Sequence, residues 1–149
     1  MVKVLFVVKR LTRRIKALTL KLNRLENLKF KTTQELDGMP KAKSGADIIA
    51  RIVADICDGN QLLTDLKYIR AACRLELCKL FEKVFGAEHL YFELQTMTYR
   101  YAYDYSFAKI AERINYSIQS VYRFHLSALS KLNIKLSDLQ AEENFVDRC

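Results

Sequence analysis

Four polar or charged side chains lie close together late in the chain: Gln119, Ser120, Tyr122 and Arg123. A glutamine amide and an arginine guanidinium can each form paired hydrogen bonds to a flat partner such as the edge of a DNA base. Serine and tyrosine hydroxyls can bond to a base or to a phosphate oxygen. This chemistry requires all four side chains to share one exposed surface, which depends on the elements that position them.

The residues around this group, 106–132, predict two helices separated by a tight turn. The apolar positions of the first helix recur at helical spacing: Phe107, Ile110, Ala111 and Ile114. Asn115 tolerates the left-handed conformation that ends a helix, and Ser117 is a favoured N-cap for the next one. The apolar face predicted for the second helix consists of Ile118, Val121, His125, Ala128, Leu129 and Leu132. The four polar side chains then point away from that face, near the helix start.

Two helices joined in this way predict a helix-turn-helix, whose second helix enters the DNA major groove by its first turns. The side chains expected to contact bases or adjoining phosphates are Ser117, Gln119, Ser120, Tyr122 and Arg123. Lys109 and Arg113, on the first helix, are expected to approach the DNA backbone. The alternative is an ordinary helical hairpin without a ligand.

The overall charge favours a polyanionic partner. The 149 residues include 25 Lys and Arg against 17 Asp and Glu, a formal net charge of +8. Such an excess promotes binding to nucleic acid through the release of phosphate counterions. An anionic membrane surface would fit the same charge, and a basic protein can also be merely soluble. With only 4 Gly and 1 Pro, the composition favours long helices over an all-β fold.

The sequence offers no pattern for catalysis, a cofactor or a metal. The cysteines, none of them in a CxxC pair, are Cys57, Cys73, Cys78 and Cys149. With His89 and His125 as the only histidines, no zinc pattern can be assembled. We expect reduced thiols in a cytosolic setting. The alternative, a disulfide, would need a geometry that sequence cannot supply. Without a nucleophile–base pair, an acidic dyad or a glycine-rich phosphate loop, a non-enzymatic protein is predicted. His125 is expected to be a packing residue.

The N-terminal third predicts one long basic helix. Residues 4–8 are apolar but too few to span a bilayer, and we expect them to begin the helix. The apolar stripe that follows is Leu11, Ile15, Leu18, Leu22, Leu25 and Leu28. The opposite face is rich in Lys and Arg, so it could contact a nucleic-acid backbone. It could equally be the solvated face of a coiled coil or, less readily, lie on a membrane.

A loop at Asp37–Gly45, with Asp47 as a helix N-cap, is predicted to precede a second long helix. Its heptad-like seam is Ile49, Ile52, Ile56, Gly59, Leu63, Leu66, Arg70, Cys73, Leu77, Leu80 and Val84. Because this seam keeps its phase across Asp58-Gly59-Asn60, one continuous helix is expected. Its apolar stripe must be covered by the first helix, by another copy of the chain, or by both. The simplest solution is a helical hairpin that also forms a homodimer.

The C-terminal part is predicted to complete a three-helix domain. Gly86 is expected to end the long helix, and residues 88–101 to form a helix with one apolar face: Leu90, Leu94, Met97 and Tyr101. Tyr99 to Tyr105 alternate as in a strand, but their helical flanks favour a helix end and a loop. The polar tail after Asp138 is expected to be partly frayed. The predicted all-α fold therefore has a coiled-coil-like helical hairpin at 1–85, a helix-turn-helix domain at 86–136 and a polar tail at 137–149.

The C-terminal part of the chain carries a recognisable set of positions: Leu94, Tyr101, Ser106-Phe107, Ile110-Ala111-Glu112-Arg113, Tyr116-Ser117, Val121 and Ala128-Leu129. Two more specific pieces are the break at Asp37-Gly38-Met39-Pro40 and the run from Tyr116 to His125. On these residues the C-terminal part resembles the promoter-reading domain of bacterial sigma factors, and the chain from about Arg10 to Leu132 resembles a phage-encoded family of small sigma-like regulators. The chain departs from the family before Arg100 and Tyr101, where it has Met97-Thr98-Tyr99. It departs again at Leu126 and Ser127, which replace small and basic residues.

The resemblance implies a double-stranded DNA-binding protein that regulates transcription of phage or prophage genes in the cytoplasm of a bacterial host cell. Host RNA polymerase is a further partner that the resemblance suggests. Two other interpretations remain. A small terminase-like DNA-packaging subunit would also be helical with a helix-turn-helix. A helical adaptor would bind a protein through the long hairpin and ignore DNA.

Overall fold

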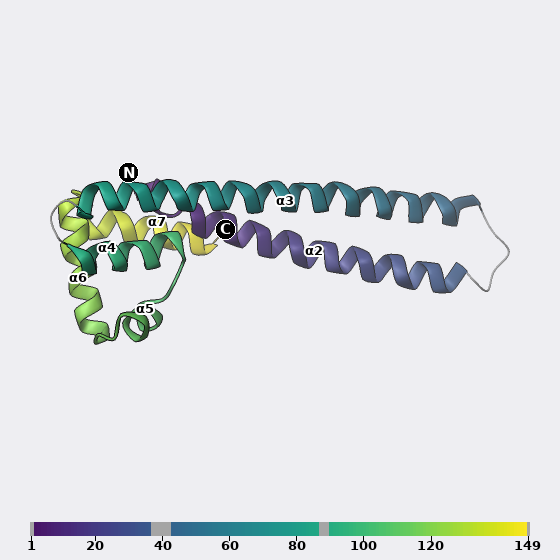
Figure 1. Cartoon of the computed structure of the whole chain (residues 1–149). Helices are drawn as coiled ribbons and strands as arrows, with labels where there is room; N and C mark the ends of the chain where they lie inside the picture. The colour runs from purple at the N-terminus through teal and green to yellow at the C-terminus, as the bar shows by residue number, and fades with distance from the viewer. Residues whose placement is uncertain (1, 37–42, 87–89, 149) are drawn as a thin grey trace. The chain divides into compact units, whose positions relative to one another are not determined.

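The computed structural model describes residues 2–36, 43–86 and 90–148, and every regular element in these ranges is helical (Figure 1). The elements are α1 (Val2–Leu5), α2 (Val7–Leu36), α3 (Lys43–Phe85), α4 (Tyr91–Met97), the π-helix η2 (Thr98–Ala102), α5 (Phe107–Ile114), α6 (Ile118–Lys131) and α7 (Leu136–Arg148). The predicted all-α class is confirmed. The apolar N-terminal residues are helical except at Phe6, where a turn divides the expected single helix into α1 and α2. Within the described ranges, no helix is long and apolar enough to cross a bilayer.

The long helix α3 is continuous through Asp58-Gly59-Asn60, as its seam predicted. Its 43 residues correspond to about 64 Å at the helical rise. Two expectations at its start were wrong: Lys43–Gly45 belong to α3 rather than to the loop, and Asp47 lies inside the helix rather than at its N-cap. A single glycine costs a helix only about 1 kcal/mol, so Gly45 does not end it. The rest of the predicted loop, 37–42, lies outside the described residues.

The chain groups into two compact units, one of Met1–Leu11 with Arg70–Cys149 and the other of Thr12–Ile69. In the second unit, α2 contacts α3 at Gly59, where an added Cβ would lie 2.5 Å from Leu22 Cδ2. A larger residue at this position would therefore displace the Leu22 side chain. The same two helices line a shallow cavity of about 300 Å³, formed by Arg14, Ala17, Leu18, Lys21, Leu62 and Leu66.

The first unit has a core built from both ends of the sequence. Its buried residues are Leu5, Phe6, Val8, Leu77, Phe81, Phe85, Met97, Tyr101, Ala102, Ala128, Leu129, Leu132, Ile134 and Leu139. The expectation of a frayed tail after Asp138 was wrong, because α7 packs against α1 and buries Leu139 in this core. Sequence periodicity could not show this contact, since it joins residues far apart in the chain.

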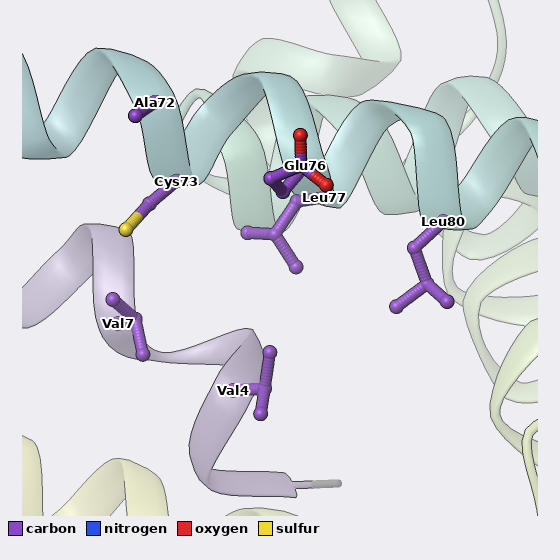
Figure 2. Close-up of a pocket in the computed structure, with 7 residues that line it drawn as sticks. All are labelled: Val4, Val7, Ala72, Cys73, Glu76, Leu77 and Leu80. Atoms are coloured by element: carbon purple, nitrogen blue, oxygen red, sulfur yellow. The ribbon is translucent and has the colours of Figure 1, made fainter.

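An apolar cavity of about 330 Å³ lies where the N-terminal residues meet α3 (Figure 2). Its lining residues are Val4, Val7, Ala72, Cys73, Glu76, Leu77 and Leu80. A ligand site normally combines apolar walls with several convergent polar groups. This lining is almost entirely aliphatic, so we do not assign it as the functional site.

The helix expected at 88–101 begins at Tyr91 and changes to a π-helix at Thr98. The Tyr103 backbone N–H donates to the Thr98 carbonyl over 3.2 Å, five residues back. The predicted inward positions are correct: Leu90 and Leu94 pack against the core, and Met97 and Tyr101 are buried. The alternating tyrosines therefore occupy a helix end and a loop, as expected, and not a strand.

Candidate nucleic-acid interface

Side-chain caps fix the bounds of α5 and α6 where the sequence placed them. Ser106 Oγ accepts a hydrogen bond from the Lys109 backbone N–H (3.3 Å) at the start of α5. Asn115 ends that helix in the left-handed conformation, with φ 57° and ψ 46°. Ser117 Oγ then accepts from the Ser120 backbone N–H (3.1 Å) and begins α6. Each predicted role in the turn is confirmed at the level of local structure.

A small apolar cluster holds α5 against α6. Its buried members are Ile110, Ala111 and Val121, and the partly buried ones are Tyr99, Tyr105, Phe107 and Ile114. The predicted inward face of α5 is therefore correct. Full burial of an isoleucine or valine, as at Ile110 and Val121, contributes about 1.5–3 kcal/mol each. The angle between the two helices is consequently set by packing and not by the turn alone.

A group of aromatic rings supports the turn from the α4 side. Phe92 stacks on Phe124 with ring centroids 5.1 Å apart, and Tyr116 meets Phe92 edge to face at 4.8 Å. The Ser127 hydroxyl donates to Glu93 of α4 over 3.1 Å. These contacts tie α4 to α6, so the start of α6 is braced by neighbours from two directions.

The outward side of α6 is open where the sequence predicted. Gln119 and Arg123 are exposed, and Tyr122 is 40% exposed. The Tyr122 ring packs edge to face on Phe107, which holds it in place (5.6 Å between centroids). Ser120 is half-buried, and its hydroxyl bonds to that of Ser117 over 2.9 Å. The two serines therefore serve the helix cap, whereas the other three side chains are free to meet a ligand.

One residue on the predicted inward face of α6 lies elsewhere. Ile118 is 54% exposed, although Val121, His125, Ala128 and Leu129 are buried as expected. Helical side chains lean toward the N-terminus of their helix. Ile118 is the first residue of α6 and therefore projects beyond the part of α6 that α5 buries at Val121. The helical repeat alone does not show where the packing of α5 on α6 ends.

Lys109 and Arg113 lie beside three packed tyrosines, which we call the tyrosine cluster: Tyr99, Tyr103 and Tyr105. Tyr99 and Tyr105 stack with an interplanar angle of 9°, at 5.9 Å between centroids. Lys109 Nζ lies 4.1 Å from the centre of the Tyr105 ring. The Arg113 guanidinium lies 5.5 Å from the centre of Tyr99, whose hydrogen bond raises the pKa of Arg113 further.

A third cation, Arg74 of α3, lies 5.5 Å from the centre of the Tyr103 ring. Sequence reasoning missed it, because nothing in the pattern of α3 links this position to the tyrosines. An aromatic ring attracts a cation but does not neutralise its charge. The three cations are therefore positioned by the tyrosine cluster without being neutralised by it.

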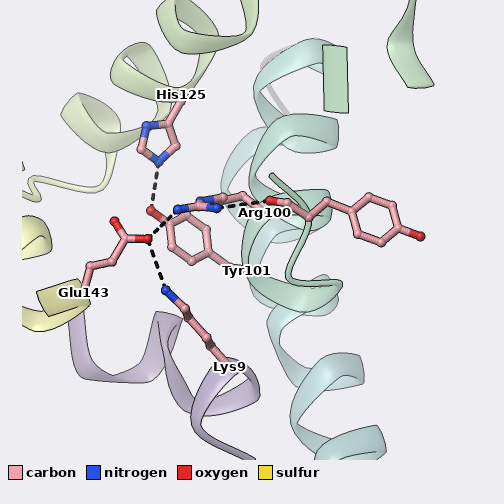
Figure 3. Close-up of polar contacts among 6 residues, drawn as sticks. Lys9, Arg100, Tyr101, His125 and Glu143 are labelled. Carbon is pink, nitrogen blue, oxygen red and sulfur yellow. Dashed lines mark hydrogen bonds and ion pairs between the residues drawn. The ribbon is translucent and has the colours of Figure 1, made fainter. Parts of the chain in front are cut away.

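Behind this surface, His125 is a packing residue, as predicted. It is 2% exposed, and its Nε2 forms a hydrogen bond with the Tyr101 hydroxyl (2.8 Å; Figure 3). Burial, and secondly the charge of Arg100, lower the pKa of His125 to about 4. Burial also raises the pKa of Tyr101. Both groups are thus neutral near pH 7, and the pair joins η2 to α6 without a buried charge.

Glu143 of α7 connects three segments of the first unit (Figure 3). Its carboxylate accepts from Arg100 of η2 over 2.5 Å and pairs with Lys9 of α2 over 3.3 Å. Arg100 also donates to the Tyr105 carbonyl (3.2 Å) and lies over the Phe107 ring. This partly buried network fixes η2, and with it the residues that lead into α5.

Cys57, Cys73 and Cys78 are free thiols, as expected, and Cys149 and His89 lie outside the described residues. In the described part of the chain, no group of His, Cys, Asp or Glu side chains is arranged to hold a metal ion. In comparisons with known proteins, no protein-family model, curated protein or solved structure matches this chain.

Proposed function

We propose that the chain binds double-stranded DNA through α5, the turn and α6, used as a helix-turn-helix, and regulates transcription of phage or prophage genes. The observation that carries the proposal is the open outward side of α6 at Gln119, Tyr122 and Arg123. These residues lie in the first two turns of the helix, where such motifs contact base edges. In the proposed complex, Lys109 and Arg113 contact the phosphate backbone, and Arg74 adds a third backbone contact.

The arrangement of the rest of the chain supports this assignment. A three-helix domain of α4, α5 and α6 would present α6 to the groove, while the α2–α3 pair would act as a helical hairpin. The net charge of +8 favours a polyanion. The assignment of phage regulation rests on the resemblance of the sequence, and host RNA polymerase is the further partner that this resemblance suggests.

The test begins by selecting bound duplexes from fragments of the source genome at low ionic strength. Arg123→Ala should weaken binding to the preferred duplex by about 5- to 150-fold, since a paired arginine contact contributes about 1–3 kcal/mol of discrimination. The matched control is Arg51→Ala, which removes the same charge from an exposed position on α3. If Arg123→Ala keeps full sequence-specific binding, Arg123 does not contact a base. If the wild-type chain retains no duplex in the selection, the proposed function is wrong.

The backbone contacts have a different signature. Lys109→Ala and Arg113→Ala should weaken binding to all duplexes alike, and each should lower the slope of log affinity against log salt by about one. A change in sequence preference would contradict a backbone role. Comparing these variants with Arg123→Ala therefore separates positioning from base recognition.

We also propose that the functional form is a homodimer, which would let two copies bind two half-sites. Its support is the exposed apolar surface of the second unit, which includes Leu20, Leu28, Phe30 and Tyr68. Light scattering of the purified chain tests this: a dimer agrees with a regulator, whereas a ring-shaped assembly favours the terminase-like alternative. Salt-independent capture of one protein, without any DNA binding, would favour the adaptor.

A further inference from the structure

The outward side of α6 is not wholly polar. Ile118, its first residue, is 54% exposed, and Tyr122, one turn later, is 40% exposed. Residues four apart on a helix are neighbours, at about 5–6 Å between their Cβ atoms. Ile118 and Tyr122 therefore form a short apolar stripe beside the polar stripe of Gln119 and Arg123.

This stripe is held in position by its neighbours. The Tyr122 ring rests edge to face on Phe107 at an interplanar angle of 74°, and Ile118 directly follows the Ser117 cap. An exposed isoleucine has few rotamers, so it presents an ordered aliphatic surface. Both residues would enter the groove with the base-contacting side chains, because they occupy the same two turns.

The major groove offers one apolar group on the base edges, the C5-methyl of thymine. We propose that the DNA site read by α6 contains thymines whose methyl groups contact Ile118 and the exposed edge of Tyr122. Arg123, next to the stripe, and the α5 cations Lys109 and Arg113 complement nucleic acid rather than an apolar protein surface. This inference rests on the proposed function and names the bases that the same site recognises.

Deoxyuridine provides the test, because it lacks the methyl group and keeps every hydrogen-bonding group of thymine. The preferred duplex from the selection is compared with the same duplex in which deoxyuridine replaces each thymine of the site. We expect about fourfold weaker binding for each methyl group that is contacted. Substitution of thymines outside the site should leave the affinity unchanged.

Variants assign the effect to the stripe. Ile118→Ala should lose most of the preference for thymine over deoxyuridine and keep the salt dependence, whereas Ile118→Val should keep part of the preference. Leu75→Ala is the matched control, because Leu75 is also an exposed aliphatic residue, at 56%, on α3. Thermal unfolding checks that each variant is folded, which is expected because Ile118 is largely outside the core.

The outcomes separate this inference from the function on which it rests. If no duplex is preferred in the selection, both fail. If a duplex is preferred but the wild-type chain binds its deoxyuridine form equally well, only the thymine contact fails. The contact is also overturned if Ile118→Ala keeps the preference, or if this variant loses a protein partner while its DNA binding is unchanged.

Discussion

The two compact units differ in how completely they bury their apolar residues. The unit that contains both ends of the chain encloses Phe6, Phe81 and Phe85, each at most 2% exposed. In the described part of the other unit, the buried hydrophobic residues are Ile15, Leu22 and Leu66, and Phe30 is 64% exposed. One unit has a core with several layers, and the other has two helices that cover each other along one seam.

This difference indicates where the stability of the chain resides. Layers of secondary structure are stable when each apolar face is covered by another element. α3 belongs to both units as a single helix, but its residues are covered by different partners in each. The proposed binding surface on α5 and α6 is thus supported by the well-packed unit, while the other unit leaves apolar side chains exposed.

Two phenylalanine substitutions give the largest expected contrast. Phe6→Ala should lower the free energy of unfolding by about 3–5 kcal/mol, because it removes a buried ring that meets Tyr101 edge to face. Phe30→Ala, the same change on the exposed surface, should lower it by less than about 0.5 kcal/mol in a monomer. Urea unfolding measures both. Similar losses for the two variants would mean that Phe30 is covered in solution, and light scattering would then test for a dimer.

Acid should weaken the well-packed unit selectively, since its His125 has a folded-state pKa of about 4 against about 6.5 when unfolded. Below pH 6.5 the unfolded chain binds a proton that the folded chain excludes. The free energy of unfolding should therefore fall by about 1.4 kcal/mol per pH unit between pH 6.5 and about 4. His125→Gln can still bond to Tyr101 but cannot be protonated. Between about pH 7 and about pH 5, the free energy of unfolding should fall by about 2 kcal/mol less in the variant than in the wild type. An equal fall in both proteins would contradict this explanation.

The smallest expected effect probes the seam of the two-helix unit. Gly59→Ala should gain about 1 kcal/mol from helix propensity, but its Cβ would displace the buried Leu22 side chain. The two effects should nearly cancel. In a Leu22→Ala background the displacement disappears, so the same substitution should stabilise by up to about 1 kcal/mol. An equal gain in both backgrounds, measured by a double-mutant cycle, would show that the close approach carries no cost.

Local sequence chemistry predicted the structure well where the cause was local. Asn115 and Ser117 fixed the turn between α5 and α6, and the apolar seam predicted the unbroken course of α3 past Gly59. The open side of α6 at Gln119 and Arg123 also followed from helical spacing. Capping and periodicity act within a few residues, so one sequence is enough to apply them.

The features that were missed depend on contacts between distant parts of the chain. Nothing near Leu5 or Leu139 indicates that both enter one core, and nothing near Arg74 indicates a tyrosine partner. The exposure of Ile118 depends on where its neighbours stop covering α6. The π-helical turn at Thr98–Ala102 likewise has no local pattern that we could identify beforehand.

The contact between Lys9 and Glu143 spans 134 positions in sequence. During synthesis, α1 therefore leaves the ribosome long before α7 exists, and the contacts between these two helices are among the last in this core to form. Closing such a long separation is slow compared with forming local helices. The proposed DNA-binding surface would thus gain its full support only once α7 has been made.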